Sequence, residues 1–500
     1  MNKNMGALVM ALDQGTTSSR SIVFDSNYAI FSHSQTELAQ FFPQSGWVEQ
    51  DPNEIWQTTL YTARQAMEQQ DLMSEHISAI GISNQRETTI VWSRLTGKPV
   101  YNAIVWQDRR TADYCRKHQQ HGLQKMVSEK TGLLLDPYFS ASKIAWILDN
   151  VSGARAAAER GELAFGTVDS WLIWNLTAGS VHASDVTNAS RTMLFNIHSQ
   201  DWDNELLQLF NIPPSMLPAV FDCNACFGYT AEPLFDGAIK ICGVAGDQQA
   251  AAMGQACFTK GMLKSTYGTG CFALLNTGKT AVQSQHKLLT TIASRLNGEI
   301  TYALEGSIFI AGASIQWLRD GLGIIQSAEQ SGQDAQTSDI DQDVYLVPAF
   351  TGLGAPWWDP EARAAILGIS LATGRREIVR AALESVCYQT LDLLGAMHAD
   401  WQTVSDTVLR VDGGMAVNDW TMQFLADVLQ APIDRPVITE TTALGAAWLA
   451  ASHAGIWPDR DDFASTWQCQ RRFTPNMCVE RRNAKVNGWN AAINRVRTAP

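Results

Sequence analysis

A short polar segment near the start of the chain, Asp13–Arg20, lies between two apolar stretches, Ala7–Leu12 and Ser21–Phe24. It combines one carboxylate, one glycine and a run of hydroxyl groups in what we expect to be a hairpin turn between two strands. The N–H and O–H groups of such a turn can bind phosphate oxygens, and the carboxylate can hold a divalent cation through water. The segment is not a Walker P-loop, because no Gly-Lys-Ser/Thr follows and the chain continues into a strand. A plain polar hairpin is the alternative.

A second polar segment, Asn84–Thr89, follows the apolar stretch Ile77–Ser83 and contains Arg86 beside Glu87. An adjacent Arg and Glu can form an ordinary solvated ion pair, which contributes little. A polyol site needs the same combination, because each hydroxyl group both donates and accepts a hydrogen bond. Guanidinium donors and a carboxylate acceptor together satisfy neighbouring hydroxyls.

Three aromatic residues allow two interpretations. Trp106 follows an apolar stretch, Phe272 follows a Gly/Thr-rich turn, and Tyr138 stands in an Asp-Pro-Tyr-Phe sequence. Each can be ordinary core packing. Trp106 and Phe272 could equally form the apolar wall of a small polyol site, and Tyr138 could offer its hydroxyl to a substrate.

Asp247 is the sharpest catalytic candidate. It follows Gly246 at the end of the apolar stretch Ile239–Val244 and precedes a segment of small residues that we expect to be helical. One interpretation is an Asp that caps this helix. The other is a general base that takes the proton from an attacking hydroxyl, because phosphoryl transfer needs one carboxylate positioned in this way.

The elements that must position these residues follow the same plan twice. In the first half we expect strands at Ala7–Leu12, Ser21–Phe24, Ile30–Glu37 and Ile77–Ser83. We also expect a helix with Asp51 as N-cap, Pro52 in the first turn and Glu54 completing a capping box. A hairpin should join 89–92 to 103–106, and a helix-rich region should span 109–163.

The second half repeats a strand, a Gly/hydroxyl turn and a carboxylate. Strands at Met262–Ser265 and Phe272–Asn276 flank the turn Thr266–Gly270, and a strand at Val408–Val411 leads through Asp412 and two glycines into a helix. The expected helices are 248–255, 418–429 and 442–451. Two such turns facing each other across a cleft would hold one polyphosphate from both sides. We place the domain boundary near Gly254, giving domains 1–253 and 254–500.

Composition sets the class of protein. Five hundred residues favour two domains of about 250 residues each or three smaller ones. The 45% apolar residues and 17 Trp supply large cores. The net charge of −13 carries no basic stripe, which argues against nucleic acid and anionic membranes as partners. No stretch approaches eighteen apolar residues, so we expect no membrane insertion. The odd number of cysteines, nine, favours a reducing compartment and a cytoplasmic protein.

Several segments together resemble the glycerol-phosphorylating members of the FGGY carbohydrate kinase family, in the same order and from about Ala7 to about Trp489. They are 13–20, 84–92, 101–107, 137–140, 187–195, 246–249, 266–272, 311–319, 348–357 and 411–414. So many ordered matches are implausible by chance.

This resemblance implies an α/β protein with two actin/hexokinase-like (ribonuclease H-like) domains and an active site in the cleft between them. It implies MgATP-dependent phosphorylation of a terminal hydroxyl of glycerol, giving sn-glycerol 3-phosphate and ADP, by a homodimer or homotetramer. Asp247 matches the catalytic base, and Asp13 and Asp247 match the carboxylates associated with Mg²⁺ through water. The matching glycerol contacts are Arg86, Glu87, Trp106, Tyr138, Asp247, Gln248 and Phe272. The first phosphate loop matches Thr16, Thr17, Ser18 and Arg20, and the nucleotide contacts match Thr269, Gly312, Gln316, Gly414 and Asn418.

The chain also departs from the pattern of some relatives. Ala238 stands where relatives inhibited by fructose 1,6-bisphosphate carry an Arg, so we expect that inhibition to be lost. The segment Pro475–Glu480 departs from the motif by which enteric relatives bind a phosphotransferase regulator. Two other functions stay open: a kinase for another small polyol or sugar of the same family, and a non-catalytic actin-like ATP-binding protein.

Overall fold

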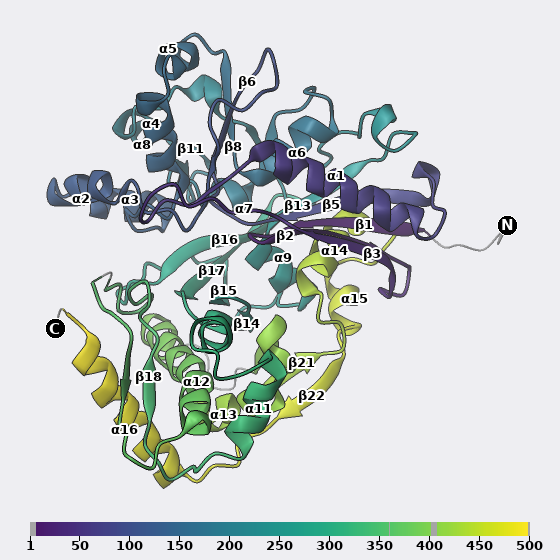
Figure 1. Ribbon diagram of the computed structural model, residues 1–500. Helices are drawn as coiled ribbons and strands as arrows, with labels where there is room; N and C mark the ends of the chain where they lie inside the picture. The colour runs from purple at the N-terminus through teal and green to yellow at the C-terminus, as the bar shows by residue number, and fades with distance from the viewer. Residues whose placement is uncertain (1–6, 360, 402–407, 499–500) are drawn as a thin grey trace.

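The computed structural model describes residues 7–359, 361–401 and 408–498. The two halves of the chain form two lobes, each built on one β-sheet (Figure 1). The predicted α/β fold with two sheets is confirmed. The candidate residues are positioned where the two lobes meet.

The sheet of the first half has the strand order β13-β5-β1-β2-β3. Strands β1, β2 and β3 form an antiparallel meander, and β5 and β13 add to it in parallel with β1. Their bounds are β1 Leu8–Gln14, β2 Ser18–Phe24, β3 Ile30–Glu37, β5 Ile77–Asn84 and β13 Ile241–Gly246. These five strands agree with the predicted apolar stretches. Strand β2, however, begins three residues before its prediction.

The sheet of the second half has the order β16-β17-β15-β14-β20-β21-β22. Strands β14, β15 and β17 pair antiparallel, and β20 and β21 add in parallel with β14, so the pairing pattern of the first sheet recurs. The bounds are β14 Leu263–Tyr267, β15 Cys271–Gly278, β16 Leu289–Leu296, β17 Glu299–Ile308, β20 Leu409–Asp412, β21 Ile433–Pro436 and β22 Cys469–Phe473. The predicted internal repeat is therefore present as a repeated strand topology, with β16 and β22 added at the two edges.

Helix α1 (Pro52–Glu68) covers the first meander and begins as predicted. The Asp51 side chain accepts the backbone N–H of Asn53, and Pro52 stands in the first turn. The predicted capping box is wrong, because the Glu54 carboxylate accepts the backbone N–H of Ala39 at 3.2 Å and is directed toward the chain after β3. Glu54 therefore fixes the helix to its neighbouring loop.

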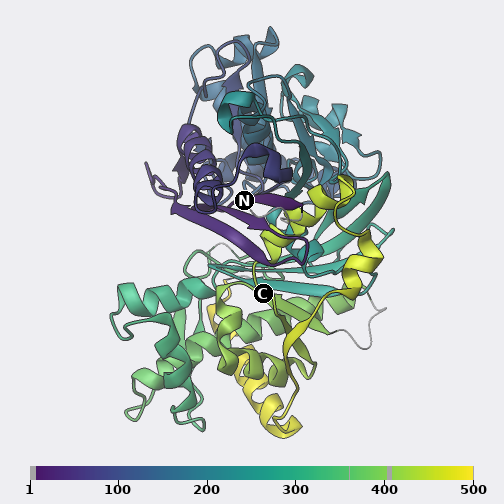
Figure 2. The ribbon, with the colours of Figure 1, turned by 90° about the vertical axis from the view of Figure 1, so that its right-hand side faces the viewer.

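Two helices cross between the lobes, α9 (Asp247–Gly254) and α14 (Thr441–His453). They approach so closely that a Cβ at Gly254 would lie 2.0 Å from the carbonyl oxygen of Thr441, and one at Gly445 would lie 1.8 Å from that of Ala250. Although α14 belongs to the second half of the chain, it packs against β5, β13 and β1 of the first sheet (Figures 1 and 2). The domain boundary near Gly254 stays a prediction.

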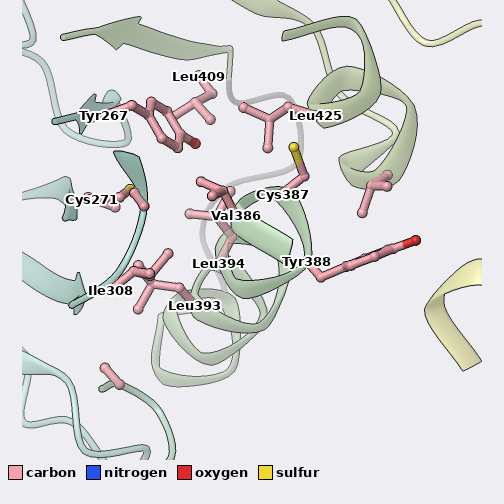
Figure 3. Packing of buried hydrophobic residues seen from close by; sticks show 14 of the residues in the cluster. Tyr267, Cys271, Ile308, Val386, Cys387, Tyr388, Leu393, Leu394, Leu409 and Leu425 are labelled. Atoms are coloured by element: carbon pink, nitrogen blue, oxygen red, sulfur yellow. The ribbon is translucent and has the colours of Figure 1, made fainter. Parts of the chain in front are cut away.

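The core of the second half lies around the long helix α12 (Arg375–Asp400). Figure 3 shows side chains of α12, among them Val386 and Leu393, packed between the sheet and α13 (Asp419–Leu429). Tyr267 and Cys271 belong to this core and immediately flank the turn 268–270. Because both flanking side chains are buried, the turn is held firmly at the end of its hairpin.

The remaining elements surround the two sheets. In the first half they are β4 (Glu49–Gln50), η1 (Ser74–His76), β6 (Ile90–Ser93), β7 (Ala103–Ile104), α2 (Ala112–Gln120), α3 (Gln124–Thr131), α4 (Ser140–Asn150), α5 (Ala154–Glu159), β8 (Leu163–Gly166), α6 (Val168–Leu176), β9 (Ala183–Asp185), α7 (Val186–Ala189), β10 (Phe195–Asn196), β11 (Asp201–Trp202), α8 (Asn204–Leu209), η2 (Pro214–Met216), β12 (Ala219–Phe221) and η3 (Glu232–Leu234). In the second half they are α10 (Gly312–Gln316), η4 (Trp317–Gly321), α11 (Ala328–Gln336), β18 (Tyr345–Val347), β19 (Ala365–Leu367), η5 (Gly414–Val417), α15 (Arg460–Ser465) and α16 (Val479–Val496). The predicted helix-rich region is confirmed by α2–α5. The predicted 89–106 hairpin is reduced to isolated bridges, because β6 forms its ladder with β8 and Pro99 cannot donate to a second one.

Candidate active site

The first polar turn is shorter than the sequence suggested. The backbone N–H of Gly15 donates to the carbonyl of Ser18 at 2.9 Å, so only 15–17 form the turn, and Ser18 and Arg20 lie in β2. Thr17 is exposed, and Thr16 is partly buried. The turn thus presents the hydroxyls of two consecutive threonines at the end of a closed hairpin.

Arg20 has a partner that its sequence context does not suggest. Its guanidinium forms an ion pair with Glu440, which precedes helix α14. The guanidinium of Arg20, predicted to bind phosphate, is therefore already paired with a carboxylate from the second half of the chain.

Asp13 lies in β1 beside Ser83 of β5 and opposite Arg20 of β2. Burial, together with the negative charges of Glu440 and Asp247, raises the pKa of the Asp13 carboxyl from 3.8 to about 6 against the opposing effect of Arg20. The structure therefore brings the two predicted magnesium-associated carboxylates, Asp13 and Asp247, close enough to repel each other. Such a site favours a proton or a cation between them.

Arg86 and Glu87 are buried rather than solvated, since Arg86 is 3% exposed and Glu87 is 1% exposed. We call this pair the polar clamp. Arg86 Nε lies 3.1 Å from Oδ1 of Asp247. Burial raises the pKa of the Glu87 carboxyl, while Arg191 and Arg86 oppose that rise. Because buried charges are costly unless paired, this arrangement indicates a site built around these groups.

Glu87 has a backbone φ of 60°, which is unfavourable for a residue with a side chain. Its carbonyl oxygen accepts hydrogen bonds from the hydroxyls of Ser140 and Thr89, both at 3.0 Å, and lies 3.4 Å from Nζ of Lys143. Lys143 also donates to the carbonyl of Tyr138 at 2.7 Å. The surrounding donors therefore hold Glu87 in a strained conformation, as is common at functional sites.

Three aromatic side chains meet across the two lobes. The ring centroid of Trp106 lies 5.7 Å from that of Tyr138 and 6.0 Å from that of Phe272, both in edge-to-face geometry. Tyr138 is buried, whereas Trp106 and Phe272 are partly exposed. The Trp106 indole N–H donates to the Thr16 hydroxyl at 2.9 Å. Trp106 is therefore not simple core packing, since it links the aromatic group to the first polar turn.

Asp247 is not the N-cap of α9. Gly246 holds that position, and Asp247 is the first residue of the helix. Its Oδ1 accepts the backbone N–H of Gln248 at 2.7 Å, and its side chain is 32% exposed. A Cβ at Gly246 would lie 2.6 Å from Cδ of Arg86, so only glycine lets Arg86 pass this point. The local sequence thus places an accessible carboxylate directly beside the buried clamp.

The residues predicted for the nucleotide come together in the second lobe. The carbonyl of Thr269 accepts the N–H groups of Ala311 and Ala313, and the N–H of Gly312 donates to Gly268. Gln316 is exposed at the end of α10, and Gly414 is exposed at the start of η5. Asn418 caps α13 by accepting the N–H of Thr421. Of these residues, Thr269 and Gly312 are joined directly at the second glycine turn, and the assignment of the whole set to a nucleotide stays a prediction.

Sequence reasoning missed three buried charged residues of this site. Glu305 in β17 contacts Arg86 and Arg191, and Lys264 in β14 donates to the Gln248 side chain at 2.6 Å. Burial lowers the pKa of Lys264. For Glu305 and Lys264 the signal in the sequence is a charged residue inside an otherwise apolar or small-residue strand, since such a residue is rarely buried without a partner. Arg191 follows α7 and carries no such signal.

Comparison with known proteins gives a consistent result. The N-terminal domain of the FGGY family of carbohydrate kinases matches residues 8–254, and the C-terminal domain of that family matches residues 263–454. The glycerol kinase of Sinorhizobium fredii (strain NBRC 101917 / NGR234) is 62% identical over 492 residues, covering 98% of this chain and 99% of its own. The chain belongs to the FGGY family of carbohydrate kinases. The glycerol kinase of Rhizobium meliloti (strain 1021) is 60% identical over the same share of both chains.

Solved structures of other kinases share the fold over nearly the whole chain. The crystal structure of Plasmodium falciparum glycerol kinase with ADP superposes with a TM-score of 0.90 at 36% identity, covering 100% of both chains. Gluconate kinase from Lactobacillus acidophilus superposes with a TM-score of 0.85 at 19% identity, which shows the fold alone. The predicted two-domain, actin-like α/β fold is thereby confirmed. No helix in the described part of the chain is long and apolar enough to cross a membrane.

Proposed function

We propose that this protein transfers the terminal phosphoryl group of ATP to a terminal hydroxyl of glycerol, giving sn-glycerol 3-phosphate and ADP. The observation that carries this proposal is the position of Asp247. It stands at the start of α9, where the two lobes meet, with its carboxylate 3.1 Å from Arg86 of the buried polar clamp. The glycerol kinases that are about 60% identical to the whole chain support the choice of substrate.

The site residues divide by chemistry. Arg86 and Glu87 supply the donors and acceptors for two neighbouring hydroxyls, and Gln248 supplies an amide. Trp106, Tyr138 and Phe272 enclose the three-carbon chain, and the phenol of Tyr138 adds one hydroxyl. A small neutral triol matches this set, because every polar face has a partner and the aromatic rings cover the C–H groups.

The nucleotide is proposed to lie between the two glycine turns. Thr16 and Thr17 supply the first turn, and Ser18 and Arg20 lie in the adjoining strand β2. We assign Thr269, Gly312, Gln316, Gly414 and Asn418 to the side of the second turn. Support comes from the repeated strand topology, which places an N–H- and O–H-rich turn in each lobe.

Asp13 and Asp247 fit a Mg²⁺ site. Magnesium is usually held by one or two carboxylates together with phosphate oxygens and water, and two mutually repelling carboxylates offer this donor set. Among the described residues no cluster of three or more His, Cys, Asp or Glu side chains could hold a metal ion. When bound, Mg²⁺ neutralises phosphate charge in the transition state.

The chemical step follows from these positions. Arg86 and Glu87 orient the terminal hydroxyl of glycerol, and Asp247 accepts its proton as the hydroxyl oxygen bonds to the γ-phosphorus. The bond between the γ-phosphorus and the β–γ bridging oxygen breaks, and ADP leaves. The hydroxyl and N–H groups of the two turns stabilise the negative charge on the phosphoryl oxygens.

The direct test is a coupled assay of ADP release with and without glycerol, extended to a panel of other polyols and sugars. Glycerol should accelerate ADP release strongly and give a stoichiometric amount of sn-glycerol 3-phosphate. Preference for another polyol would show that this polyol, and not glycerol, is the substrate. ATP turnover that no acceptor accelerates would favour a non-catalytic actin-like protein.

The proposed location is the cytoplasm, supported by nine free cysteines. The proposed dimer or tetramer can be measured by sedimentation.

A further inference from the structure

A buried carboxylate from the second lobe, Glu305 of β17, reaches into the polar clamp of the first. Its side chain is fully buried, and both oxygens contact arginines. Oε2 lies 2.5 Å from Nη1 of Arg86, and Oε1 accepts from Nη2 of Arg86 at 3.0 Å and from Nη2 of Arg191 at 2.9 Å. Burial alone would raise the pKa of Glu305, but Arg191 and Arg86 lower it to about 2. Glu305 is therefore ionised throughout the physiological pH range.

These contacts extend into a chain of alternating charges. Arg191 uses its Nε to donate to Oε1 of Glu87 at 2.6 Å, and Arg86 directs its Nε toward Asp247. Glu305 thus stands in the middle, with Arg86 and Asp247 on one side and Arg191 and Glu87 on the other. Both members of the clamp are oriented through this one carboxylate.

We propose that Glu305 is a positioning residue that holds Arg86 so that only its Nε faces Asp247. This inference deepens the proposed function and rests on it. The ion pair of Asp247 with Arg86 and its hydrogen bond with the N–H of Gln248 both involve Oδ1. Oδ2 is then the oxygen that takes the proton of the substrate hydroxyl.

The physical reason is competition for the guanidinium group. An Arg side chain binds a carboxylate most favourably through two parallel N–H···O bonds, and Glu305 takes this bidentate position. A Gln at position 305 keeps one acceptor oxygen but offers an NH2 group in place of the other, so Arg86 loses the bidentate bond and the opposite charge, and Gln249 at 3.3 Å from Nη1 does not replace them. Arg86 would then gain by turning toward Asp247 and binding both of its oxygens. Asp247 would then have no oxygen free to accept the substrate proton, and Arg86 would no longer be oriented to bind glycerol.

The test compares Glu305→Gln with a matched control elsewhere in the second lobe. Glu384 of α12 is also buried and contacts Arg380 at 3.3 Å, Lys485 at 3.4 Å and the Tyr388 hydroxyl at 3.2 Å, and these partners lie outside the candidate site. Both Gln variants should lower the melting temperature, because each leaves a buried cation without its partner. Only Glu305→Gln should change the glycerol kinetics.

We expect kcat/KM for glycerol to fall about 10²-fold in Glu305→Gln, because a misplaced orienting group costs about this much. The KM for ATP should change less than kcat/KM for glycerol, since Asp247 is the one member of the charge chain that also belongs to the proposed Mg²⁺ site. Glu384→Gln should keep both constants. If the two variants lose the same stability and both keep wild-type kcat/KM for glycerol, Glu305 serves the fold alone and the inference is wrong.

A double-mutant cycle provides a readout that loss of stability does not move. In an Arg86→Lys background the bidentate partner of Glu305 is already absent, so Glu305→Gln should cost less than about threefold further in kcat/KM. Additive effects of the two changes would overturn the positioning role.

A second variant covers the case in which Glu305→Gln does not fold. Glu305→Asp keeps the charge at a shorter reach and should lose about tenfold in kcat/KM for glycerol; an unchanged kcat/KM would again contradict the inference. A wild type without glycerol-dependent ADP release would overturn the proposed function as well, whereas an active wild type with unaffected variants would overturn only this step.

Discussion

Replacing Asp247 by Asn tests the central assignment. The change keeps the shape of the side chain and removes its charge and its basicity. The carboxamide oxygen can occupy the position of Oδ1 and still accept the N–H of Gln248, which is 2.7 Å away. Arg86 keeps both of its bonds to Glu305. The fold and the binding of both substrates should therefore survive, while proton transfer to residue 247 is lost.

The magnitude follows from the role of a general base. Such a group contributes ~10²–10⁴-fold to rate, which corresponds to about 3–6 kcal/mol in activation free energy at about 1.4 kcal/mol per factor of ten. We expect kcat of Asp247→Asn to fall by this factor. The dissociation constants of glycerol and ATP should change by less than about tenfold, because the loss concerns mainly the transition state.

The assay is coupled ADP release at saturating glycerol and ATP, together with calorimetric binding of each substrate. A matched control is Asp459→Asn, the same change at the N-cap of α15, where the Asp459 side chain accepts the N–H groups of Asp461 and Asp462. Asn is also a good N-cap, so this variant should keep full activity and stability. If Asp247→Asn retains turnover within about tenfold of wild type, the base is another group and the mechanism fails.

Three further predictions use other parts of the structure. A propanediol that lacks one hydroxyl of glycerol should be ~10⁴–10⁵-fold less efficient in steady-state kinetics, because a buried hydrogen-bonding atom of the clamp that faces this hydroxyl would be left unpaired; comparable efficiency would contradict the clamp. Trp106→Phe removes the indole N–H that bonds to the Thr16 hydroxyl, so KM for both glycerol and ATP should rise about three- to tenfold; an effect on glycerol alone would show that this link is not used. Burial raises the pKa of Asp169 from 3.8 to about 7. The contribution of the protonated Asp169 to the free energy of unfolding is fully present below pH 4 and is lost as pH rises through 7. Asp169→Asn should therefore exceed wild type by up to roughly 4 kcal/mol in free energy of unfolding at pH 8 and by much less at pH 5. A difference in melting temperature that does not change with pH would contradict this last prediction.

Local patterns carried most of the fold. The apolar stretches that became β1, β3, β5 and β14 were readable because side-chain burial follows strand periodicity along a few residues. The start of α1 was readable from Asp51 and Pro52, because capping is a contact between neighbours in sequence. The capping box was wrong because Glu54 found a better partner outside the helix, in the N–H of Ala39.

The candidate site divides in the same way. A carboxylate at the start of α9 and a polar pair after β5 were visible as residue types at strand ends, and the family resemblance then gave each a role. The conformation of Glu87, with φ of 60°, was not visible, because two of the donors that hold its carbonyl, Ser140 and Lys143 of α4, lie more than 50 residues away in the sequence. The link from Trp106 to Thr16 joins residues 90 positions apart and has no local signature.

The amino-acid sequence by itself determined which residues could do chemistry, where the repeated strands and turns lie, and which family the chain belongs to, because these depend on short-range pattern and on ordered motifs. Only the tertiary structure decided how the charges are shared. Glu305 stands 219 residues from Arg86 and 114 from Arg191, and Glu440 stands 420 residues from Arg20. A buried charge must find an opposite charge, but which one it meets is fixed by the packing of the two lobes, and no local pattern carries that information.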